Sequence, residues 1–200
     1  MAGVTPSIAG ASPEDPMRQD RTKWNKKYRK DKYPAGASDV VKKFCHLAPG
    51  KKALDIAAGN GRNSIFLVRQ GFTVDAVDIS EVGLAELAGR YSNINAICAD
   101  LDQFEIHADH YDLIVNIKFL NRRLFACIRE GLKPGGVVIF ETLLDPGNMR
   151  NPPKHHRDYL LKPNELLHAF QSMRIIHYCE TDDAESDESH PLASLVGIKQ

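Results

Sequence analysis

Two glycines and two carboxylates give this sequence its first chemical signal. Gly59 and Gly61 follow an apolar run that contains Asp55, and a second apolar run ends at Asp78. Glycines at such a junction let the backbone approach a ligand closely, and a helix that begins there offers unpaired N–H groups. A carboxylate at the end of the next strand accepts hydrogen bonds from the ribose hydroxyls of a nucleoside. The spacing therefore predicts a crevice for a nucleoside cofactor, either S-adenosylmethionine or NAD.

Further features separate these two cofactors. Asp55 lies inside the first predicted strand, where an NAD site is normally apolar, and Ser64 stands where the NAD fingerprint has its third glycine. Asp100 closes the third predicted strand, in a position to accept from an adenine amino group. Residues 133–136 (Lys-Pro-Gly-Gly) form a turn directly before the fifth strand. Backbone needs alone explain a tight turn, but the combination of features favours S-adenosylmethionine.

Alternating strand and helix patterns surround these residues and must position them. Apolar, β-rich runs predict strands at residues 53–57, 73–79, 96–99, 113–117, 137–142, 174–179 and 193–198. Helical patterns lie at 38–47, 63–69, 81–90, 120–132 and 163–172, whereas residues 102–110 hold only a turn. Strands that are apolar throughout indicate a parallel sheet covered by helices on both faces. We therefore predict an α/β, Rossmann-like domain whose sheet ends in one antiparallel strand.

The composition is that of an ordinary globular chain with balanced charge. Of the 200 residues, 42% are hydrophobic and 26% charged, and the formal net charge is zero. This length suits one domain, which we place at residues 21–200. The four cysteines show no CxxC spacing, so neither a disulfide framework nor a metal site is expected. No apolar run approaches the ~20 residues that cross a membrane, and we expect a cytoplasmic protein.

The N-terminal segments differ in composition from the rest of the chain. Residues 1–20 are rich in Ala, Gly, Ser and Pro, and they predict a disordered leader that lacks the features of a signal peptide. Residues 21–36 are basic and contain Trp24, Tyr28 and Tyr33, which form either a lid on the crevice or an anchor that fixes this segment to the domain. The basic side chains are either a solvated face or a means of attracting an anionic substrate.

Five segments resemble the class I S-adenosylmethionine-dependent methyltransferases. They are LDIAAGNGRNSIFL, VDAVDIS, ADL, YDLIVN and LKPGGVVIFET, in the order and spacing of that family. Within it the chain is similar to the small bacterial tellurite-resistance (TehB-like) group from about Lys23 to the C-terminus. Its KWNKKYRKDKYP segment looks like the group's N-terminal piece, which closes over the cofactor. The resemblance implies a seven-stranded, mostly parallel sheet of order 3-2-1-4-5-7-6 and S-adenosylmethionine as cofactor.

The resemblance also implies which residues bind the cofactor. Asp55, Ala57, Gly59 and Gly61 would line its methionine part, Asp78 and Ile79 its ribose, Asp100 and Leu101 its adenine, and Asn116 its sulfonium, with Trp24, Tyr28 and Asn63 completing the set. The chain departs from the family at one point, because the family often has Gly-Cys-Gly where this sequence has Ala57-Ala58-Gly59. Alanine is small enough for binding to survive, with the loop slightly further from the ligand.

No catalytic residue follows securely from the sequence. Methyl transfer from a sulfonium is an in-line displacement that needs alignment, and a general base helps only a nucleophile that carries a proton. The candidates are Asn116 at the end of the fourth strand, Tyr28, and His155 in the loop after the fifth strand, for which simple solvent exposure is the alternative.

These observations predict a methyltransferase that acts on a small-molecule acceptor such as an oxyanion, a thiol or another small nucleophile. An NAD(P)-dependent oxidoreductase and a non-catalytic cofactor-binding or regulatory protein are the alternatives. Nucleic acid is not expected as a partner, because only the basic N-terminal segment supports it and the net charge is zero. Either a monomer or a homodimer fits the sequence.

Overall fold

The sheet has the strand order that the resemblance implies. The computed structural model describes residues 16–30, 36–145, 159–181 and 191–200. Seven strands pair in the order β3-β2-β1-β4-β5-β7-β6. β7 runs antiparallel to β5 and β6, and the other pairs are parallel. The strands are β1 (Lys52–Ile56), β2 (Thr73–Asp78), β3 (Ile94–Cys98), β4 (Tyr111–Ile117), β5 (Leu132–Leu143), β6 (Arg174–Glu180) and β7 (Leu192–Ile198).

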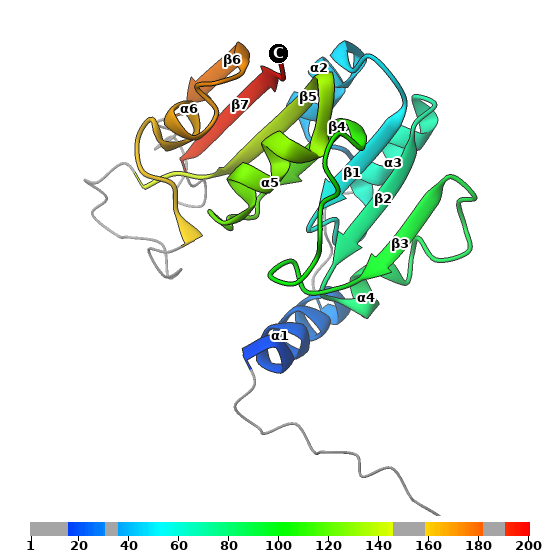
Figure 1. Ribbon diagram of the computed structural model, residues 1–200. Coiled ribbons are helices and arrows are strands. Elements are labelled where there is room, and N and C mark those ends of the chain that lie inside the picture. Colours follow the sequence, from blue (N-terminus) through cyan, green and yellow to red (C-terminus); the bar gives the residue numbers. More distant parts are fainter. Residues whose placement is uncertain (1–15, 31–35, 146–158, 182–190) are drawn as a thin grey trace, which may run out of the picture.

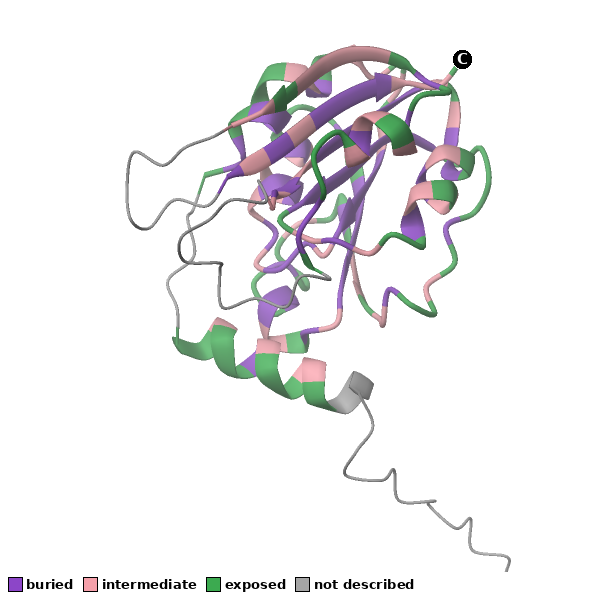
Figure 2. Ribbon diagram, turned by 90° about the vertical axis from the view of Figure 1, so that its left-hand side faces the viewer, coloured by how far each residue is buried: buried purple, intermediate pink, exposed green. Residues whose placement is uncertain are grey.

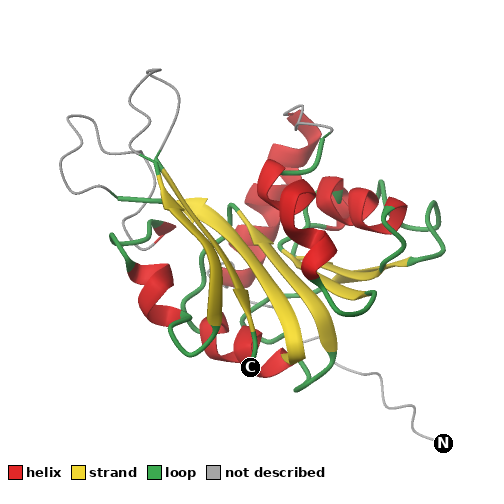
Figure 3. Cartoon of the chain, turned by 90° about the horizontal axis from the view of Figure 1, so that it is seen from above, coloured by secondary structure: helices red, strands yellow, loops and turns green. Residues whose placement is uncertain are grey.

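Helices cover both faces of the sheet, as Figures 1 and 3 show. The helices are α1 (Pro16–Lys30), α2 (Asp39–Phe44), α3 (Arg62–Arg69), α4 (Glu81–Leu84), α5 (Leu124–Gly131), α6 (Glu165–Ala169) and the short 3-10 helix η1 (Cys45–Leu47). α5 and α6 lie on one face, and α2 and α3 lie on the other. Among the described residues, no helix has both the length and the apolar character of a membrane span.

Two hydrophobic cores, one on each face, hold the layers together. Every residue of β4 is buried, and its consecutive residues Ile114 and Val115 belong to opposite cores. Ile114 shares its core with Phe170 after α6, and Val115 shares the other core with Leu67 of α3. Full burial of one such side chain contributes about 1.5–3 kcal/mol relative to exposure. The continuous apolar runs in the sequence are therefore strands that pack on both faces.

α4 is shorter than the helix expected at residues 81–90. It ends at Leu84, and the chain continues in turns to Gly89, whose φ of +72° is left-handed. Glycine in a helix interior costs about 1 kcal/mol relative to alanine, and both Gly83 and Gly89 fall inside the expected helix. The expected helix at 120–132 is also shorter than expected and spans Leu124–Gly131.

The N-terminal helix corrects the expected boundary of the leader. Residues 16–20 were placed in a disordered leader, but they are the first residues of α1, which begins at Pro16. Proline is favoured as the first residue of a helix because its missing N–H would be unpaired there in any case. Figure 1 shows α1 beside α4, beneath the C-terminal ends of β1, β2 and β3. Residues 1–15, and Tyr33 with its neighbours at 31–35, lie outside the described part of the chain.

Candidate functional site

The expected cofactor residues meet at one edge of the sheet. Ile56 at the end of β1 pairs with both Val77 of β2 and Asn116 of β4, and Asp78 pairs with Cys98 of β3. The C-terminal ends of these four parallel strands are therefore aligned. In open α/β sheets ligands bind in the crevice beyond this edge, so the register brings the glycine loop, Asp78 and Asn116 to one crevice.

The loop after β1 (residues 57–61) turns sharply back toward the sheet. Ala57, Gly59 and Gly61 have φ values of +53°, +58° and +73°, all in the left-handed region. The loop is tied to β2 by the Ala58 N–H, which donates to the Val77 carbonyl at 3.0 Å. A left-handed conformation costs an L-residue other than glycine about 1–2 kcal/mol. Ala57, which stands where the resembling family often has glycine, therefore carries strain.

Asp78 links the glycine loop to the end of β2. Its Oδ2 accepts from the Gly59 N–H at 2.8 Å, and its Oδ1 accepts from the Ser80 N–H at 2.8 Å. Burial raises the pKa of this carboxyl, and hydrogen bonding by the backbone of Ser80, Gly59 and Ile79 opposes that rise. A carboxylate has about four lone-pair sites, so the bonds from Gly59 and Ser80 leave capacity for the hydroxyls of a ribose. The carboxylate acceptor at this point fits the ribose hydroxyls of a nucleoside cofactor.

Asp55 is buried beneath the loop and holds it from inside. Its side chain is 1% exposed, and its Oδ2 accepts from the Ser64 hydroxyl in the first turn of α3 at 2.6 Å. Burial raises the pKa of the Asp55 carboxyl to about 6, although the Ser64 contacts lower it. The hydrogen bond joins β1 to α3 across the glycine loop. A direct contact of Asp55 with the cofactor remains a prediction.

Two asparagines that were expected to bind the cofactor, Asn63 and Asn116, make hydrogen bonds to the backbone beside the crevice. The Asn63 carboxamide is buried in α3 and accepts from the Ser38 N–H at 3.0 Å, which fixes the start of α2. Asn116 is 1% exposed, and its Nδ2 donates to the Phe119 carbonyl at 2.7 Å, which closes the turn after β4. Both side chains therefore position backbone at the rim of the crevice.

The expected adenine residues follow β2 and β3. The Asp100 Oδ1 accepts from the Asp102 N–H at 2.9 Å and shapes the turn that replaces a helix at this point. Leu101 is buried in the core on the α5 side, whereas Ile79 is partly exposed. These residues lie beside the end of β2 because β2 and β3 are paired up to Asp78 and Cys98.

Tyr28 of α1 reaches the glycine loop. A Cβ atom placed on Gly59 would overlap the Tyr28 hydroxyl, and one placed on Gly83 would lie 3.1 Å from Tyr28 Cε2. The ring therefore lies close to both the loop after β1 and helix α4. Trp24 lies one helical turn before Tyr28, and the centroids of the two rings are 6.1 Å apart. Of the catalytic candidates, Tyr28 lies at the glycine loop, Asn116 lies at the end of β4, and His155 is outside the described residues.

Sequence reasoning missed Asn25, which is the buried residue of a largely exposed helix. It is 8% exposed, whereas most of α1 is open to solvent (Figure 2). Its signal was available, because Arg21, Trp24, Asn25 and Tyr28 have the i, i+3, i+4, i+7 spacing of a packing face. Asn25 was not recognised as a packing residue because such faces are identified by apolar residues, and asparagine is polar.

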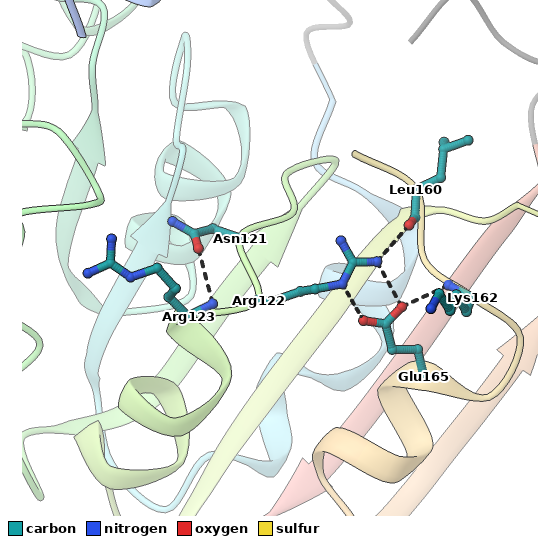
Figure 4. A network of polar contacts seen from close by, with 6 residues as sticks. All are labelled: Asn121, Arg122, Arg123, Leu160, Lys162 and Glu165. Carbon is teal, nitrogen blue, oxygen red and sulfur yellow. Dashed lines mark hydrogen bonds and ion pairs between the residues drawn. The ribbon is translucent and has the colours of Figure 1, made fainter. Parts of the chain in front are cut away.

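On the other side of β4, Arg122 clamps the segment that leads into α6 (Figure 4). Its Nε and Nη2 atoms donate to the two Glu165 carboxylate oxygens at 2.6 and 2.9 Å, and Nη2 also donates to the Leu160 carbonyl at 2.9 Å. Burial raises the pKa of Glu165, but the hydrogen bonds from Arg122 and from the Lys162 N–H outweigh it, so the pKa is lowered. The clamp fixes residues 160–165 next to the start of α5.

Sequence reasoning also missed Glu141, a second carboxylate near the end of β4. It lies on β5 opposite Ile117, and its carbonyl accepts from the Lys118 N–H at 2.7 Å. Burial raises the pKa of the Glu141 carboxyl, and the charges of Lys118 and Arg62 lower it. Glu141 therefore carries a partly buried carboxylate on β5, beside the end of β4.

Comparison with known proteins places the site in a wider context. Residues 53–136, which include the glycine loop, Asp78 and Asn116, match the sequence model of a family described as the methyltransferase domain. The ubiquinone biosynthesis O-methyltransferase of Pasteurella multocida (strain Pm70) is 28% identical over 153 residues, which are 60% of this chain and 63% of that protein. The chain thus covers less than two thirds of that relative.

Solved structures share the fold over most of the chain. TehB from Haemophilus influenzae has a TM-score of 0.69 at 24% identity, covering 90% of this chain and 67% of its own. The 1,6-didemethyltoxoflavin-N1-methyltransferase of Burkholderia thailandensis, solved with 1,6-didemethyltoxoflavin and S-adenosylhomocysteine, also has a TM-score of 0.69, at 16% identity over 97% of this chain and 93% of that one. At these identities the likeness is one of fold.

Proposed function

We propose that this chain, which has the fold of the class I S-adenosylmethionine-dependent methyltransferases and a segment that matches the methyltransferase domain, transfers a methyl group from S-adenosylmethionine to a small-molecule acceptor. The observation that carries the proposal is the hydrogen bond from the Gly59 N–H to Asp78. It joins a left-handed glycine loop and a carboxylate with spare acceptor capacity at the ligand-binding edge of a parallel sheet.

In this proposal different residues of the crevice bind different parts of the cofactor. Asp78 would hold the ribose hydroxyls, Asp100 would lie toward the adenine, and the backbone of Gly59 and Gly61 would approach the methionine part. The cofactor supplies a methyl group that is already activated by the sulfonium. The protein then needs chiefly to align the acceptor with that methyl group and to exclude water.

Two parts of the chain serve alignment and exclusion of water. Helix α1 lies over the crevice, with Trp24 and Tyr28 on its inner side and Tyr28 against Gly59. Asn116 fixes the turn after β4, which borders the space where an acceptor would meet the sulfonium. Glu141 offers a carboxylate to an acceptor that must lose a proton.

The acceptor that we propose is a small nucleophile such as an oxyanion, a thiol or a hydroxyl compound. Resemblance to the tellurite-resistance group supports an oxyanion, and similarity to an enzyme named as an O-methyltransferase supports a hydroxyl compound. A radiolabelled methyl-transfer assay with tellurite, a small thiol and a catechol distinguishes these classes.

Isothermal titration calorimetry with S-adenosylmethionine, S-adenosylhomocysteine and NAD tests the cofactor. We expect micromolar binding of the first two ligands and none of NAD. Micromolar binding of NAD without binding of S-adenosylhomocysteine would overturn the proposal in favour of an oxidoreductase.

A further inference from the structure

Helix α1 meets the domain through a narrow and mostly polar face. We define its docking face as Arg21, Trp24, Asn25 and Tyr28, the residues of α1 from Arg21 onward that are not fully exposed. The rest of that stretch is dominated by exposed lysines and arginines. Its two aromatic members, Trp24 and Tyr28, are only partly buried, whereas the polar Asn25 is buried. A buried polar side chain costs free energy unless it is hydrogen-bonded, so the contacts of Asn25 matter to docking.

Asn25 makes the hydrogen bonds at the centre of the docking face. Its Nδ2 donates to Glu81 Oε1 at 3.0 Å, and its Oδ1 accepts from the Ser80 hydroxyl at 2.7 Å. The Ser80 hydroxyl in turn accepts from the Gly83 N–H at 3.1 Å and so caps α4. Buried amide groups satisfied on both sides specify one arrangement of the packed elements.

These contacts continue to the cofactor residues without a break. The Ser80 N–H donates to Asp78 Oδ1, and the Gly59 N–H donates to Asp78 Oδ2. Tyr28, one turn after Asn25, lies against the same Gly59. The docking face therefore touches the loop after β1 and the segment after β2, which are the two segments assigned to the cofactor.

We propose that Asn25 is a positioning residue that holds α1 docked on the crevice, and that docking of α1 and binding of the cofactor favour each other. The proposal rests on the proposed function, because it concerns the same site. Coupling between two such events is reciprocal by thermodynamic necessity. A ligand that binds only the docked state loses affinity in proportion to the docked fraction. Loss of Asn25 lowers that fraction.

Trp24 makes the docking measurable, because it is the single tryptophan of the chain and lies on the docking face. The experiment compares full-length wild type, Asn25→Ala and the control Gln19→Ala, which truncates an exposed amide on the same helix. Trp24 emission is recorded with and without saturating S-adenosylhomocysteine, and the affinity is measured by calorimetry. Far-UV circular dichroism and thermal unfolding report whether each variant is folded.

We expect Asn25→Ala to bind S-adenosylhomocysteine about tenfold more weakly, as the loss of a buried hydrogen-bonding side chain predicts. Its Trp24 emission should be red-shifted in the free protein and return toward the wild-type spectrum at saturation. Gln19→Ala should match wild type in both measurements. A variant with wild-type affinity and emission overturns the proposal, and so does a variant with weaker binding but unchanged Trp24 emission.

A double variant keeps the proposal testable if Asn25→Ala does not fold. Asn25→Asp places a carboxylate beside Glu81, whereas Asn25→Asp combined with Glu81→Gln restores the hydrogen bond between these two positions with donor and acceptor exchanged, and the Ser80 hydroxyl remains the donor of the other bond. We expect the single substitution to weaken binding and the combination to recover at least half of the loss. Failure of that rescue overturns the proposal. If wild type binds no S-adenosylhomocysteine at all, the proposed function fails instead.

Discussion

The Gly59 backbone N–H donates to the Asp78 carboxylate at 2.8 Å, so the loop after β1 and the end of β2 form one unit. Either residue alone has a structural explanation, since glycine permits a tight turn and a buried carboxylate needs hydrogen-bond donors. Their contact places a charged acceptor where the backbone can approach a ligand. The geometry of the loop and the affinity for a cofactor therefore depend on the same carboxylate.

Replacement of Asp78 should weaken cofactor binding and loosen the glycine loop. Asp78→Ala removes the proposed ribose contact and leaves the Gly59 and Ser80 N–H groups without their acceptor. We expect S-adenosylhomocysteine binding to weaken by about 1–3 kcal/mol, the range for hydrogen bonds to a charged group. Calorimetry measures the loss, with the exposed Glu86→Ala as the control. Unchanged affinity of Asp78→Ala would show that the ribose contact is assigned wrongly.

Two glycine substitutions separate backbone strain from contact with Tyr28. Gly59 and Gly71 both have left-handed φ values, +58° and +85°, but only a Cβ at Gly59 would overlap the Tyr28 hydroxyl, whereas Gly71 faces open space. Both alanine variants should lose about 1 kcal/mol of unfolding free energy from strain. Gly59→Ala should in addition displace Tyr28, change Trp24 emission and weaken S-adenosylhomocysteine binding. Equal behaviour of the two variants in fluorescence and calorimetry contradicts this assignment.

The strands and the glycine loop could be predicted because they rest on local signals, whereas the strand order was implied by the resemblance to the family. Apolar runs mark the strands, and the structure joins the left-handed glycine loop to Asp78, whereas the contacts of Gly59, Gly61 and Asp78 with a cofactor stay a prediction. The docking of α1 could not be predicted, because Asn25 and Ser80 are far apart in the sequence and their hydrogen bond depends on how two helices meet.

Side-chain roles inside the site were also beyond the sequence. The resemblance implied that Asp55, Asn63 and Asn116 lie near a ligand, and each of them makes a hydrogen bond to the protein's own scaffold. Buried polar groups must find partners, and the partner is decided by packing rather than by the motif. The extent of α4 was overestimated for a related reason, since hydrophobic spacing does not record what Gly83 and Gly89 cost a helix.

The pH dependence of stability should reveal the buried carboxyl of Asp55. Its folded pKa of about 6 lies above the ordinary value of 3.8 because of burial. The folded protein therefore binds more protons than the unfolded chain between these values, and this group's contribution to stability falls as the pH rises through that window. Asp55→Asn removes the effect and should raise the unfolding free energy at pH 8 by about 1–2 kcal/mol, with no gain below pH 4.

Denaturant unfolding at several pH values measures that difference between wild type and Asp55→Asn. The same substitution should weaken S-adenosylhomocysteine binding at pH 8, because the negative charge proposed to lie near the ligand's methionine part is lost. If Asp55→Asn is more stable than wild type and binds S-adenosylhomocysteine equally well, Asp55 has a structural role and no role in cofactor binding.

The contact of Arg122 with Glu165 of α6 can be tested against the neighbouring Arg123, which serves as a matched control. Arg122 holds Glu165 through two nitrogens and also binds the Leu160 carbonyl, whereas the neighbouring Arg123 has a 3.6 Å ion pair with Asp102 on an exposed surface. Lysine keeps the charge but cannot form the forked contact. We expect Arg122→Lys to lower the unfolding free energy by about 1–2 kcal/mol at pH 7, and Arg123→Lys to change it by less than about 0.5 kcal/mol.

The pH dependence of the same pair identifies the charge that Arg122 stabilises. Because the folded pKa of Glu165 is lowered, its contribution is present above the ordinary value of 4.5 and is lost as the pH falls through the folded pKa. The difference between wild type and Arg122→Lys should therefore shrink at pH 3, as measured by urea unfolding. A difference that persists at pH 3 would assign the stability to the Leu160 contact, and equal losses for both arginines would contradict the clamp.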